Sequence, residues 1–210
     1  MTPEDLSRIA GTSLNEAALT NLSSFAGMVT RWNPRINLIS PGTLPEIWTR
    51  HIADSAQLFR YLPERADSLV DIGSGGGFPA IVLAILLAAS GRRMKIDLIE
   101  SDRRKAAFLS TALRGLGLSA TVHPRRADEV APLAAAVVTA RALAPLERLV
   151  PLALRHLDRD GVGIFPKGRN HLQELAAGSE RFRVRDIVPS LTDAESAIIM
   201  IERSDHAAVG

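Results

Sequence analysis

The chain has 210 residues, 46% of them hydrophobic and 23% charged, and its formal net charge is +2. This length and composition fit a single domain with a sizeable core and a helical extension, and the small net charge excludes a global basic footprint for nucleic acid. Because cysteine is absent, disulfides, thiolate metal sites and a cysteine nucleophile are excluded as well.

Signals for a membrane, for secretion and for a metal are also missing from the sequence. The longest apolar run, residues 78–89, is too short to span a bilayer, and the N-terminus carries no basic-then-apolar signal segment. No group of His, Asp and Glu has the spacing of metal ligands. We therefore expect a cytoplasmic protein with no membrane association and no metal site.

Residues 1–65 are predicted to form an N-terminal helical extension. The segment Ser13–Glu16 has the spacing of a capping box, and apolar residues recur behind it at helical intervals. A second box, Thr43–Glu46, predicts the start of another amphipathic helix. The connection between the two helices, residues 33–41, is expected to be irregular.

Residues 66–210 are predicted to form a sheet domain that packs with the extension as one globular unit. Strands are expected at residues 68–72, 95–100, 119–123, 134–140, 161–165, 182–188 and 196–203, with helices at 79–89, 102–116, 145–157 and 169–178. The alternation of strands and helices predicts a mainly parallel sheet that is covered on both faces. The connection of residues 189–195 is too short for a parallel crossover, so the last two strands should pair antiparallel.

The turn after the first predicted strand is the most informative motif. An apolar strand ends at Asp71, and the pattern D-x-G-x-G-x-G follows from Asp71 to Gly77. Glycines let the backbone turn sharply and approach a ligand closely. The next strand is followed by Glu100, whose carboxylate can accept two hydrogen bonds from a ribose diol. Because the carboxyl ends of parallel strands meet at one edge, these residues predict a nucleoside pocket.

The glycine spacing separates the candidate nucleoside cofactors. A dinucleotide fingerprint, G-x-G-x-x-G, would need glycine where Phe78 stands, which disfavours an NAD-dependent oxidoreductase. A phosphate-binding P-loop would need a lysine after the glycines, and none is present. The spacing found here resembles motif I of S-adenosylmethionine-dependent methyltransferases.

Two kinds of methylation chemistry are disfavoured by the sequence. Transfer to a pyrimidine C5 generally needs a cysteine nucleophile, which this chain lacks. Transfer to an exocyclic amine commonly uses an Asn/Asp-Pro-Pro-aromatic motif, whereas residues 139–143 read T-A-R-A-L. A ring nitrogen with a free lone pair needs neither device, because it only has to be aligned with the methyl group.

Several short motifs, taken in their order and spacing, resemble the RsmG (GidB) family over nearly the whole chain. They are Arg31-Trp32-Asn33 with Asn37-Leu38, Arg50-His51-Ile52-Ala53-Asp54-Ser55, Asp71 to Pro79, Glu100-Ser101 with Arg104-Lys105 and Phe108-Leu109, Arg126 to Glu129, Ala140-Arg141-Ala142, and Lys167-Gly168. The resemblance implies a class I methyltransferase fold, with a seven-stranded, mainly parallel sheet and an antiparallel last strand. It also implies S-adenosylmethionine as cofactor and methylation of guanine N7 in the 530 loop of 16S rRNA, within the small ribosomal subunit.

The resemblance also implies roles for individual residues. Arg141 and Lys167 correspond to the family's basic residues near the methyl donor and the target base, and are the candidate catalytic residues. The implied cofactor-binding residues are Asp71, Gly73, Gly75, Gly77, Phe78, Glu100, Ser101, Ala127, Asp128 and Arg141. Leu143 departs from the family pattern, because a phenylalanine that could stack on a base is usual there.

Other residues and other functions are left open by the sequence. His51 is interpreted as a hydrogen-bonded helix residue, Asp54 as structural, and Trp32 and Trp48 as core residues. The stretch from Arg92 to Arg126, with nine basic and three acidic residues, is either an RNA-docking surface together with the N-terminal helices or a solvated face. Alternative functions are a class I methyltransferase acting on a small molecule or a protein, and a non-catalytic RNA-binding or assembly module. We expect a monomer.

Overall fold

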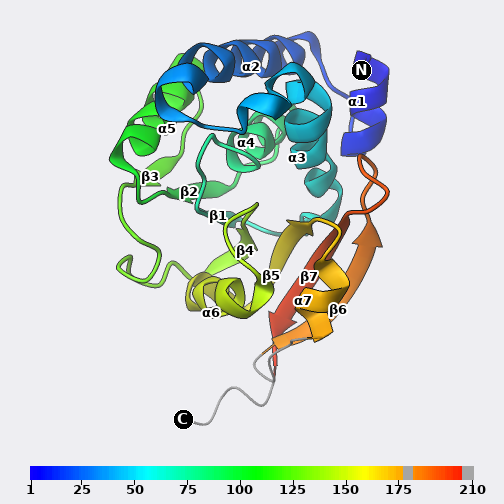
Figure 1. Ribbon diagram of the computed structural model, residues 1–210, viewed down its shortest axis with the longest axis vertical. Coiled ribbons are helices and arrows are strands. Elements are labelled where there is room, and N and C mark those ends of the chain that lie inside the picture. Colours follow the sequence, from blue (N-terminus) through cyan, green and yellow to red (C-terminus); the bar gives the residue numbers. More distant parts are fainter. Residues whose placement is uncertain (177–181, 205–210) are drawn as a thin grey trace.

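The computed structural model describes residues 1–176 and 182–204 and contains one seven-stranded sheet. The strand order is β3-β2-β1-β4-β5-β7-β6, and the first five strands of that order run parallel (Figure 1). Strand β7 is antiparallel to both of its neighbours, which confirms the predicted antiparallel final pair. The strands are β1 (Ser68–Ile72), β2 (Lys95–Ile99), β3 (Thr121–His123), β4 (Ala135–Thr139), β5 (Leu157–Lys167), β6 (Phe182–Pro189) and β7 (Ala197–Arg203).

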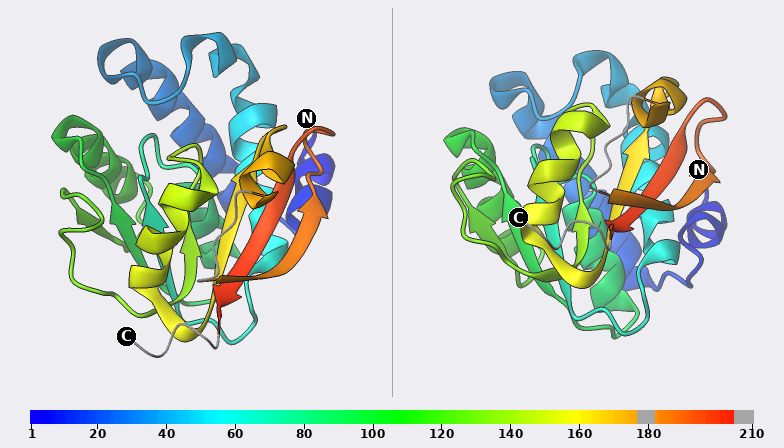
Figure 2. Two further views of the ribbon diagram at one scale, coloured as in Figure 1. Left: turned by 60° about the horizontal axis from the view of Figure 1, so that its bottom comes forward. Right: turned by 90° about the horizontal axis from the view of Figure 1, so that it is seen from below.

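Helices cover both faces of this sheet, as the alternating pattern predicts. On one face lie α2 (Glu16–Ile36), α4 (Ala80–Ala89) and α5 (Arg103–Gly115), and on the other lies α6 (Leu146–His156) (Figures 1 and 2). Neighbouring residues of a strand point to opposite faces, so Leu69 joins the first core and Val70 the second. The N-terminal helices therefore share a core with the sheet.

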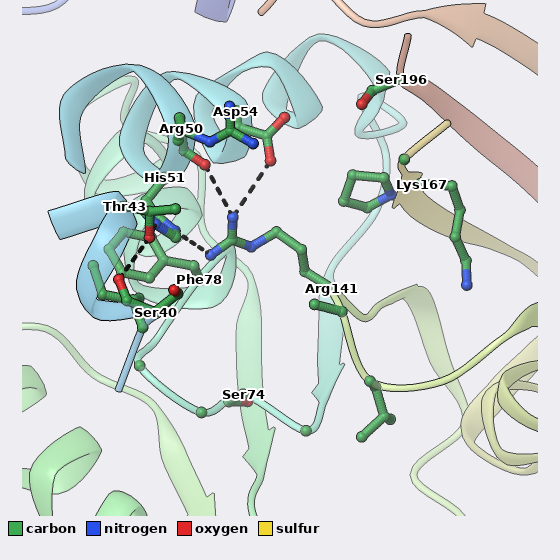
Figure 3. A pocket seen from close by; sticks show the side chains of 18 of the residues that line it. Ser40, Thr43, Arg50, His51, Asp54, Ser74, Phe78, Arg141, Lys167 and Ser196 are labelled. Carbon is green, nitrogen blue, oxygen red and sulfur yellow. Dashed lines mark hydrogen bonds and ion pairs between the residues drawn. The ribbon is translucent and has the colours of Figure 1, made fainter. Parts of the chain in front are cut away.

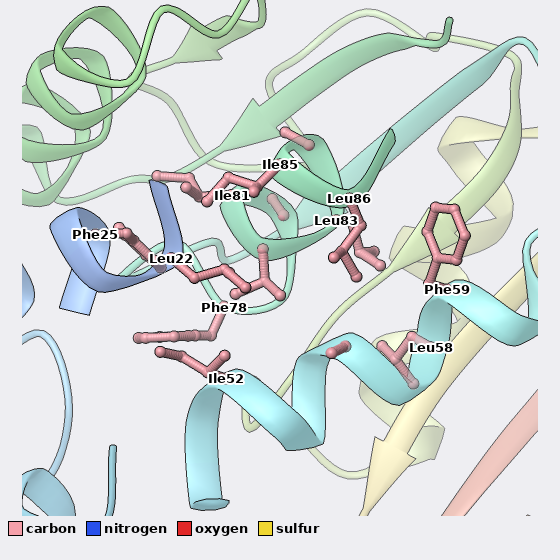
Figure 4. Packing of buried hydrophobic residues seen from close by; sticks show 14 of the residues in the cluster. Leu22, Phe25, Ile52, Leu58, Phe59, Phe78, Ile81, Leu83, Ile85 and Leu86 are labelled. Carbon is pink, nitrogen blue, oxygen red and sulfur yellow. The ribbon is translucent and has the colours of Figure 1, made fainter. Parts of the chain in front are cut away.

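Helix α4 is buried between the sheet and the N-terminal helices. Its sequence AIVLAILLAA is apolar all round, as expected for a helix that has packing partners on every side. Phe25 of α2 and Ile52 of the following segment pack around Phe78, which precedes α4 (Figure 4). This packing fixes the N-terminal segment against the turn that follows β1.

The prediction that a Ser13–Glu16 capping box starts the second helix is wrong. The N-cap of α2 is Asn15, whose side chain accepts a hydrogen bond from the Ala18 amide at 2.9 Å. Asn caps as well as Ser does, and with Asn15 as cap Glu16 becomes the first helical residue, where it cannot reach back. A capping box does occur earlier, at Thr2 and Asp5, and starts α1 (Pro3–Ala10).

The second predicted box is also wrong. Thr43 lies inside the 3₁₀ helix η1 (Pro41–Glu46), and its hydroxyl donates to the carbonyl of Ser40 instead of capping a helix. Pro41 and Pro45 of this segment have no backbone N–H to donate, which disfavours a regular α-helix here. The chain continues as the π-helical turn η2 (Trp48–Ala53), α3 (Asp54–Ala56) and the 3₁₀ helix η3 (Gln57–Tyr61). Such π turns are often found at functional sites.

Other element boundaries shift by a few residues. Helix α2 runs through Pro34 to Ile36, so the irregular connection is shorter than predicted. Strand β5 begins at Leu157, directly after α6, and β3 is only three residues long. The last helix, α7 (His171–Ala176), starts two residues later than predicted, and the predicted residues 177 and 178 lie outside the described part.

Candidate active site

A cavity of about 900 Å³ opens at the carboxyl ends of the parallel strands. The first side of the cavity comes from the turn after β1, the end of β2 and the start of α5, including Gly73, Glu100 and Lys105. The second side comes from the ends of β4 and β5, from η2 and α3, and from the β6–β7 connection. The sheet therefore brings the predicted nucleoside pocket and the basic residues Arg141 and Lys167 to one cavity (Figure 3).

The glycine turn forms a close-fitting floor on the first side of the cavity. Gly73 has a φ of +69°, which non-glycine residues rarely adopt. A Cβ at Gly73 would also lie only 2.6 Å from Cδ1 of Leu143, so the turn and the loop after β4 touch. Gly75 has a φ of +53°, and its amide donates to Oε2 of Glu100 at 2.8 Å. The positive φ of Gly75 lets its backbone amide face the carboxylate, whereas the Gly73 amide donates to the Ile99 carbonyl at 2.8 Å.

The carboxylate of Glu100 is oriented before any ligand binds. Glu100 is only 7% exposed, and its Oε1 accepts a hydrogen bond from the Asp102 amide at 2.7 Å while Oε2 accepts from Gly75. Each carboxylate oxygen retains a second acceptor site. Glu100 and the exposed Ser101 both line the cavity, as the sequence predicts. The acid can therefore accept a pair of hydroxyl donors without first reorganising.

Asp71 is fully buried beneath the glycine turn, outside the set of residues that line the cavity. Its Oδ1 accepts a hydrogen bond from the Thr139 hydroxyl at 2.7 Å, whereas Oδ2 has no hydrogen-bond partner. Burial raises the pKa of Asp71 to about 6, although hydrogen bonds from Thr139 and Ser74 and the charge of Arg141 oppose the shift. The carboxyl group thus titrates close to physiological pH.

The raised pKa of Asp71 predicts a pH-dependent contribution to stability. A native pKa above the unfolded value means that this contribution is fully present below the unfolded pKa of 3.8 and is lost as pH rises through about 6. The difference of about 2 pH units corresponds to about 3 kcal/mol. Asp71→Asn keeps an oxygen for Thr139 but does not titrate. From pH 4 to pH 7 we therefore expect its free energy of unfolding to rise by about this much relative to that of the wild type. Denaturant unfolding at both pH values measures this change, and an equal difference between the two proteins at both pH values would contradict the assignment.

The guanidinium of Arg141 points across the cavity into the N-terminal segment (Figure 3). Its Nη2 lies 2.7 Å from Nδ1 of His51, and its Nη1 donates to the Arg50 carbonyl at 3.1 Å and to Oδ2 of Asp54 at 3.5 Å. The guanidinium carbon lies 5.2 Å from the centre of the Phe78 ring, within the range of a cation–π contact. Arg141 is therefore held by residues that precede it by about ninety positions.

His51 is neutral in this arrangement. A guanidinium only donates hydrogen bonds, so Nδ1 of His51 must accept from Arg141 and cannot carry a proton. Burial, followed by the charges of Arg141 and Arg50, lowers the pKa of His51 to about 4, in agreement with this geometry. The predicted hydrogen bonding of His51 is confirmed, and the structure adds that the residue lines the cavity.

Lys167 reaches the cavity from the end of β5. Its ammonium group donates to the Ala144 carbonyl at 2.7 Å and to Oε2 of Glu174 at 2.8 Å, and its side chain is only 10% exposed. The same Glu174 oxygen accepts from the Leu146 amide at 2.8 Å, at the start of α6. Lys167 thus connects the loop after β4 to α7. Arg141 and Lys167 point in different directions (Figure 3).

Comparison with known proteins identifies the family. Residues 18–198 match the family model GidB, rRNA small subunit methyltransferase G. The chain belongs to this family. A ribosomal RNA small subunit methyltransferase G from a strain of Cereibacter sphaeroides is 44% identical over 186 residues, which cover 88% of this chain and 90% of the relative. Another, from Rhodospirillum centenum, is 44% identical over 193 residues, covering 91% of this chain and 87% of the relative.

Solved structures with a similar fold include a tRNA methyltransferase and a protein crystallised with S-adenosylmethionine. The B. subtilis M1A22 tRNA methyltransferase TrmK aligns with a TM-score of 0.56 and 18% identity, over 76% of this chain and 68% of that one. A mutant of MtNAS in complex with S-adenosylmethionine aligns with a TM-score of 0.57 and 17% identity, over 97% and 84% of the two chains. These similarities establish the class I methyltransferase fold for this member of the family.

Four of the residues predicted to bind the cofactor do not line the cavity. They are Asp71, Gly77, Ala127 and Asp128. Gly77 faces Ile81 and Phe25 in the core. The Ala127 carbonyl accepts from Nε2 of His156 at 2.9 Å, and the Asp128 side chain is 54% exposed and paired with Arg126. The short family motifs do not indicate which of these residues face the cavity and which face away from it.

Sequence reasoning missed a polar cluster that closes the second side of the cavity. The buried Gln57 donates to Oδ1 of Asp54 at 2.9 Å and accepts from the Leu191 amide at 2.8 Å, while the Thr192 hydroxyl donates to Asp54 at 3.1 Å. The family's R-H-x-x-D-S motif included Asp54, but it gave no sign of Thr192, a partner that lies more than 130 residues away. Trp32 packs on Phe108, as predicted for a core residue.

The part of the chain that the structure describes contains neither a helix able to cross a membrane nor a cluster of metal-ligand side chains. Within residues 1–176 and 182–204, no helix combines the length and the apolar character that a membrane crossing requires. Across the same residues, no three His, Asp or Glu side chains are grouped closely enough to hold a metal ion.

Proposed function

We propose that this chain transfers a methyl group from S-adenosylmethionine to N7 of a guanine in 16S rRNA. The observation that carries the proposal is the placement of the glycine turn and Glu100 beside Arg141 and Lys167 in one cavity, within a chain of this family. The first side of the cavity would take the nucleoside part of the cofactor, and the second side the target base. The 530 loop is the proposed location of that guanine.

The residues at the first side fit S-adenosylmethionine. Gly75 has a positive φ and room where a Cβ would stand, so backbone can approach a ligand there, and the oriented carboxylate of Glu100 suits a ribose diol. The unpartnered Oδ2 of Asp71 lies just beneath this turn. We propose that Gly73, Gly75, Phe78, Glu100 and Ser101 hold the cofactor. We propose that Asp71 and Gly77 support the glycine turn from below. We also propose that Ala127 and Asp128 contact the cofactor through backbone atoms.

The chemistry at guanine N7 requires positioning and no general base. When bound, S-adenosylmethionine supplies a methyl group activated by its sulfonium centre. N7 carries no proton and presents a lone pair, so the protein has to hold the base in line at close distance. Arg141 and Lys167 can bind the base or its phosphate as charged donors. The neighbouring His51 uses both ring nitrogens in hydrogen bonds, consistent with a reaction that takes no proton from the base.

The site of methylation tests this proposal. Purified protein is incubated with labelled S-adenosylmethionine and small ribosomal subunits that lack the modification, or with free 16S rRNA. Mass mapping should find 7-methylguanine at one position in the 530 loop. Methyl on guanine N2 or on a ribose oxygen would overturn the mechanism. Transfer only to a protein or a metabolite, or none at all, would support the alternative functions.

A basic rim on the cavity side is the proposed RNA-docking surface. The sheet splits the basic stretch between Arg92 and Arg126, because β2 and β3 end at the cavity edge and begin at the opposite edge. Near the cavity edge lie Arg103, Arg104, Lys105, Arg125 and Arg126, which follow the ends of β2 and β3. Near the opposite edge lie Arg92, Arg93, Lys95 and Arg114. Arg92 also has a structural role, because it donates to the Pro63 carbonyl at 2.7 Å.

This division provides a charge-matched pair of double variants. Arg103→Ala with Arg125→Ala removes two exposed charges from the basic rim, whereas Arg93→Ala with Arg114→Ala removes two from the opposite edge. We expect the first pair to raise the KM for RNA and to lower the slope of log affinity against log salt by roughly two, about one per phosphate contact. The second pair should leave both unchanged. Equal effects of the two pairs would reject the proposed surface.

We further propose that the protein acts as a monomer in the cytoplasm. A substrate in the small ribosomal subunit supports this location, and the cavity is built from one chain. Sedimentation at the concentration used for the methylation assay tests the monomer. Loss of transfer on dilution, with a second-order dependence on protein, would contradict it.

A further inference from the structure

His51 has a position that the proposed reaction does not explain. It lies in the π-helical turn η2, is 8% exposed and lines the cavity. Its ring centre is 5.2 Å from that of Phe78, on which the Arg141 guanidinium also lies. His51 therefore contacts both Phe78, at the glycine turn, and Arg141, which follows β4.

The hydrogen bonds through His51 have one consistent direction. Arg141 donates to Nδ1, so the single ring proton must be on Nε2. That nitrogen lies 2.8 Å from the hydroxyl oxygen of Thr43, which in turn donates its own proton to the Ser40 carbonyl at 2.9 Å. His51 and Thr43 each use one donor and one acceptor between the Arg141 guanidinium and the Ser40 carbonyl, so the tautomer and the orientation of the ring are both fixed.

The remaining contacts of Arg141 do not replace this bond. Nη1 reaches the Arg50 carbonyl and Asp54, with Asp54 at the longer distance of 3.5 Å, whereas Nη2 is 2.7 Å from His51. A planar guanidinium is oriented by partners on two of its nitrogens, and His51 supplies the partner on the second. Arg141, Arg50 and Asp54 are the charged groups around the histidine.

We propose that neutral His51 is a positioning residue, which aims the Arg141 guanidinium and thereby couples the N-terminal helical segment to methyl transfer. The readout by transfer rests on the proposed function, but the orientation of Arg141 does not. In this role the side chain acts through Arg141 and needs no contact with the methyl donor or the base. The segment from Ser40 to Asp54 thus becomes part of the machinery that orients a charge at the cavity.

Two substitutions separate an acceptor role from a packing role. His51→Asn places an amide oxygen near the position of Nδ1 and can still accept from Arg141, whereas His51→Phe keeps an aromatic ring against Phe78 without an acceptor. We expect His51→Phe to lower kcat at least tenfold, the scale of a hydrogen bond to a charged group, with a smaller change in KM for RNA. His51→Asn should recover most of that loss. Equal losses in both variants would overturn the proposal.

A double-mutant cycle tests whether His51 acts through Arg141. Single-turnover transfer is measured for His51→Phe, for Arg141→Ala and for the two together. If the histidine only aims the arginine, His51→Phe should cause no further loss once Arg141 is alanine. A full additional loss in that background would mean that His51 has a separate structural or catalytic role, and would reject the proposal.

A measurement without substrate keeps the inference separate from the proposed function. Nitrogen NMR of the histidines in the free protein should report His51 with Nε2 protonated and Nδ1 unprotonated at neutral pH. Arg141→Ala should shift the Nδ1 resonance, and Thr43→Val should shift Nε2. A proton on Nδ1, or an Nδ1 resonance unaffected by Arg141→Ala, would overturn the inference whatever the enzyme methylates. The same spectra show whether each variant is folded.

Discussion

Replacing Glu100 by alanine should weaken the binding of S-adenosylmethionine by a factor of roughly 10 to 150, or about 1.5–3 kcal/mol, the scale of hydrogen bonds to a charged group. The carboxylate is 7% exposed and already oriented by two backbone amides, so its loss removes the ribose acceptor and releases the glycine turn together. Calorimetric titration of the free protein with the cofactor measures the change. Because the amides of Gly75 and Asp102 lose their acceptor, we also expect a lower temperature of unfolding without cofactor.

Two comparisons make the Glu100 result specific. Glu100→Gln keeps the shape but turns an amide donor toward one of the two backbone amides, so it should bind the cofactor nearly as weakly as the alanine variant. Glu129→Ala removes an exposed acid after β3 and should leave affinity unchanged. If the wild-type protein bound a 2′,3′-dideoxy analogue as tightly as S-adenosylmethionine, the ribose role of Glu100 would be wrong.

Removing either basic residue on the second side of the cavity should reduce methyl transfer more than cofactor affinity. We expect Arg141→Ala or Lys167→Ala to lower the single-turnover rate by roughly 10²–10³, the range found when an enzyme loses one donor that stabilises the transition state. Both side chains are largely buried, at 16% and 10% exposed, so their charges are poorly screened by water. Rapid-quench transfer at saturating RNA and calorimetry with cofactor separate the two effects.

Matched variants distinguish charge from packing at these residues. Arg148→Ala removes an exposed arginine of α6 and should leave the rate of methyl transfer and the cofactor affinity unchanged. Lys167→Met keeps most of the side-chain volume, and Glu174→Gln keeps a partner for Lys167 while removing its negative charge. If Lys167→Met transferred at the wild-type rate, its ammonium group would have only a structural role. A normal rate for Arg141→Ala and Lys167→Ala together would remove both from the site.

The parts of this protein that the sequence predicted correctly depend on short-range chemistry. Apolar runs that alternate with helical segments predicted every strand of the sheet, and the seven-residue connection before β7 required an antiparallel pair. The glycine spacing after Asp71 and the acid at Glu100 predicted the cofactor side of the cavity, because turns and strand ends are encoded within a few residues. The family motifs extended this to function.

Local signals that compete with each other were decided by the fold. Ser13 and Asn15 are both good caps, and the packing of α2 on α4 selected Asn15. Thr43 resembles a cap, yet the prolines and the packing around Phe78 make it a partner of His51. The basic stretch reads as one patch along the chain, and the sheet divides it between two edges.

The sequence by itself determined the class of fold, the glycine turn, the acid at its edge and the family, because each of these is written in neighbouring residues. Only the tertiary structure decided where the side chains of the site point. Arg141 faces a histidine ninety positions earlier, and Gln57 faces a loop more than 130 residues later. Such pairings depend on strand order and on which helices cover the sheet edge, so no local pattern specifies them.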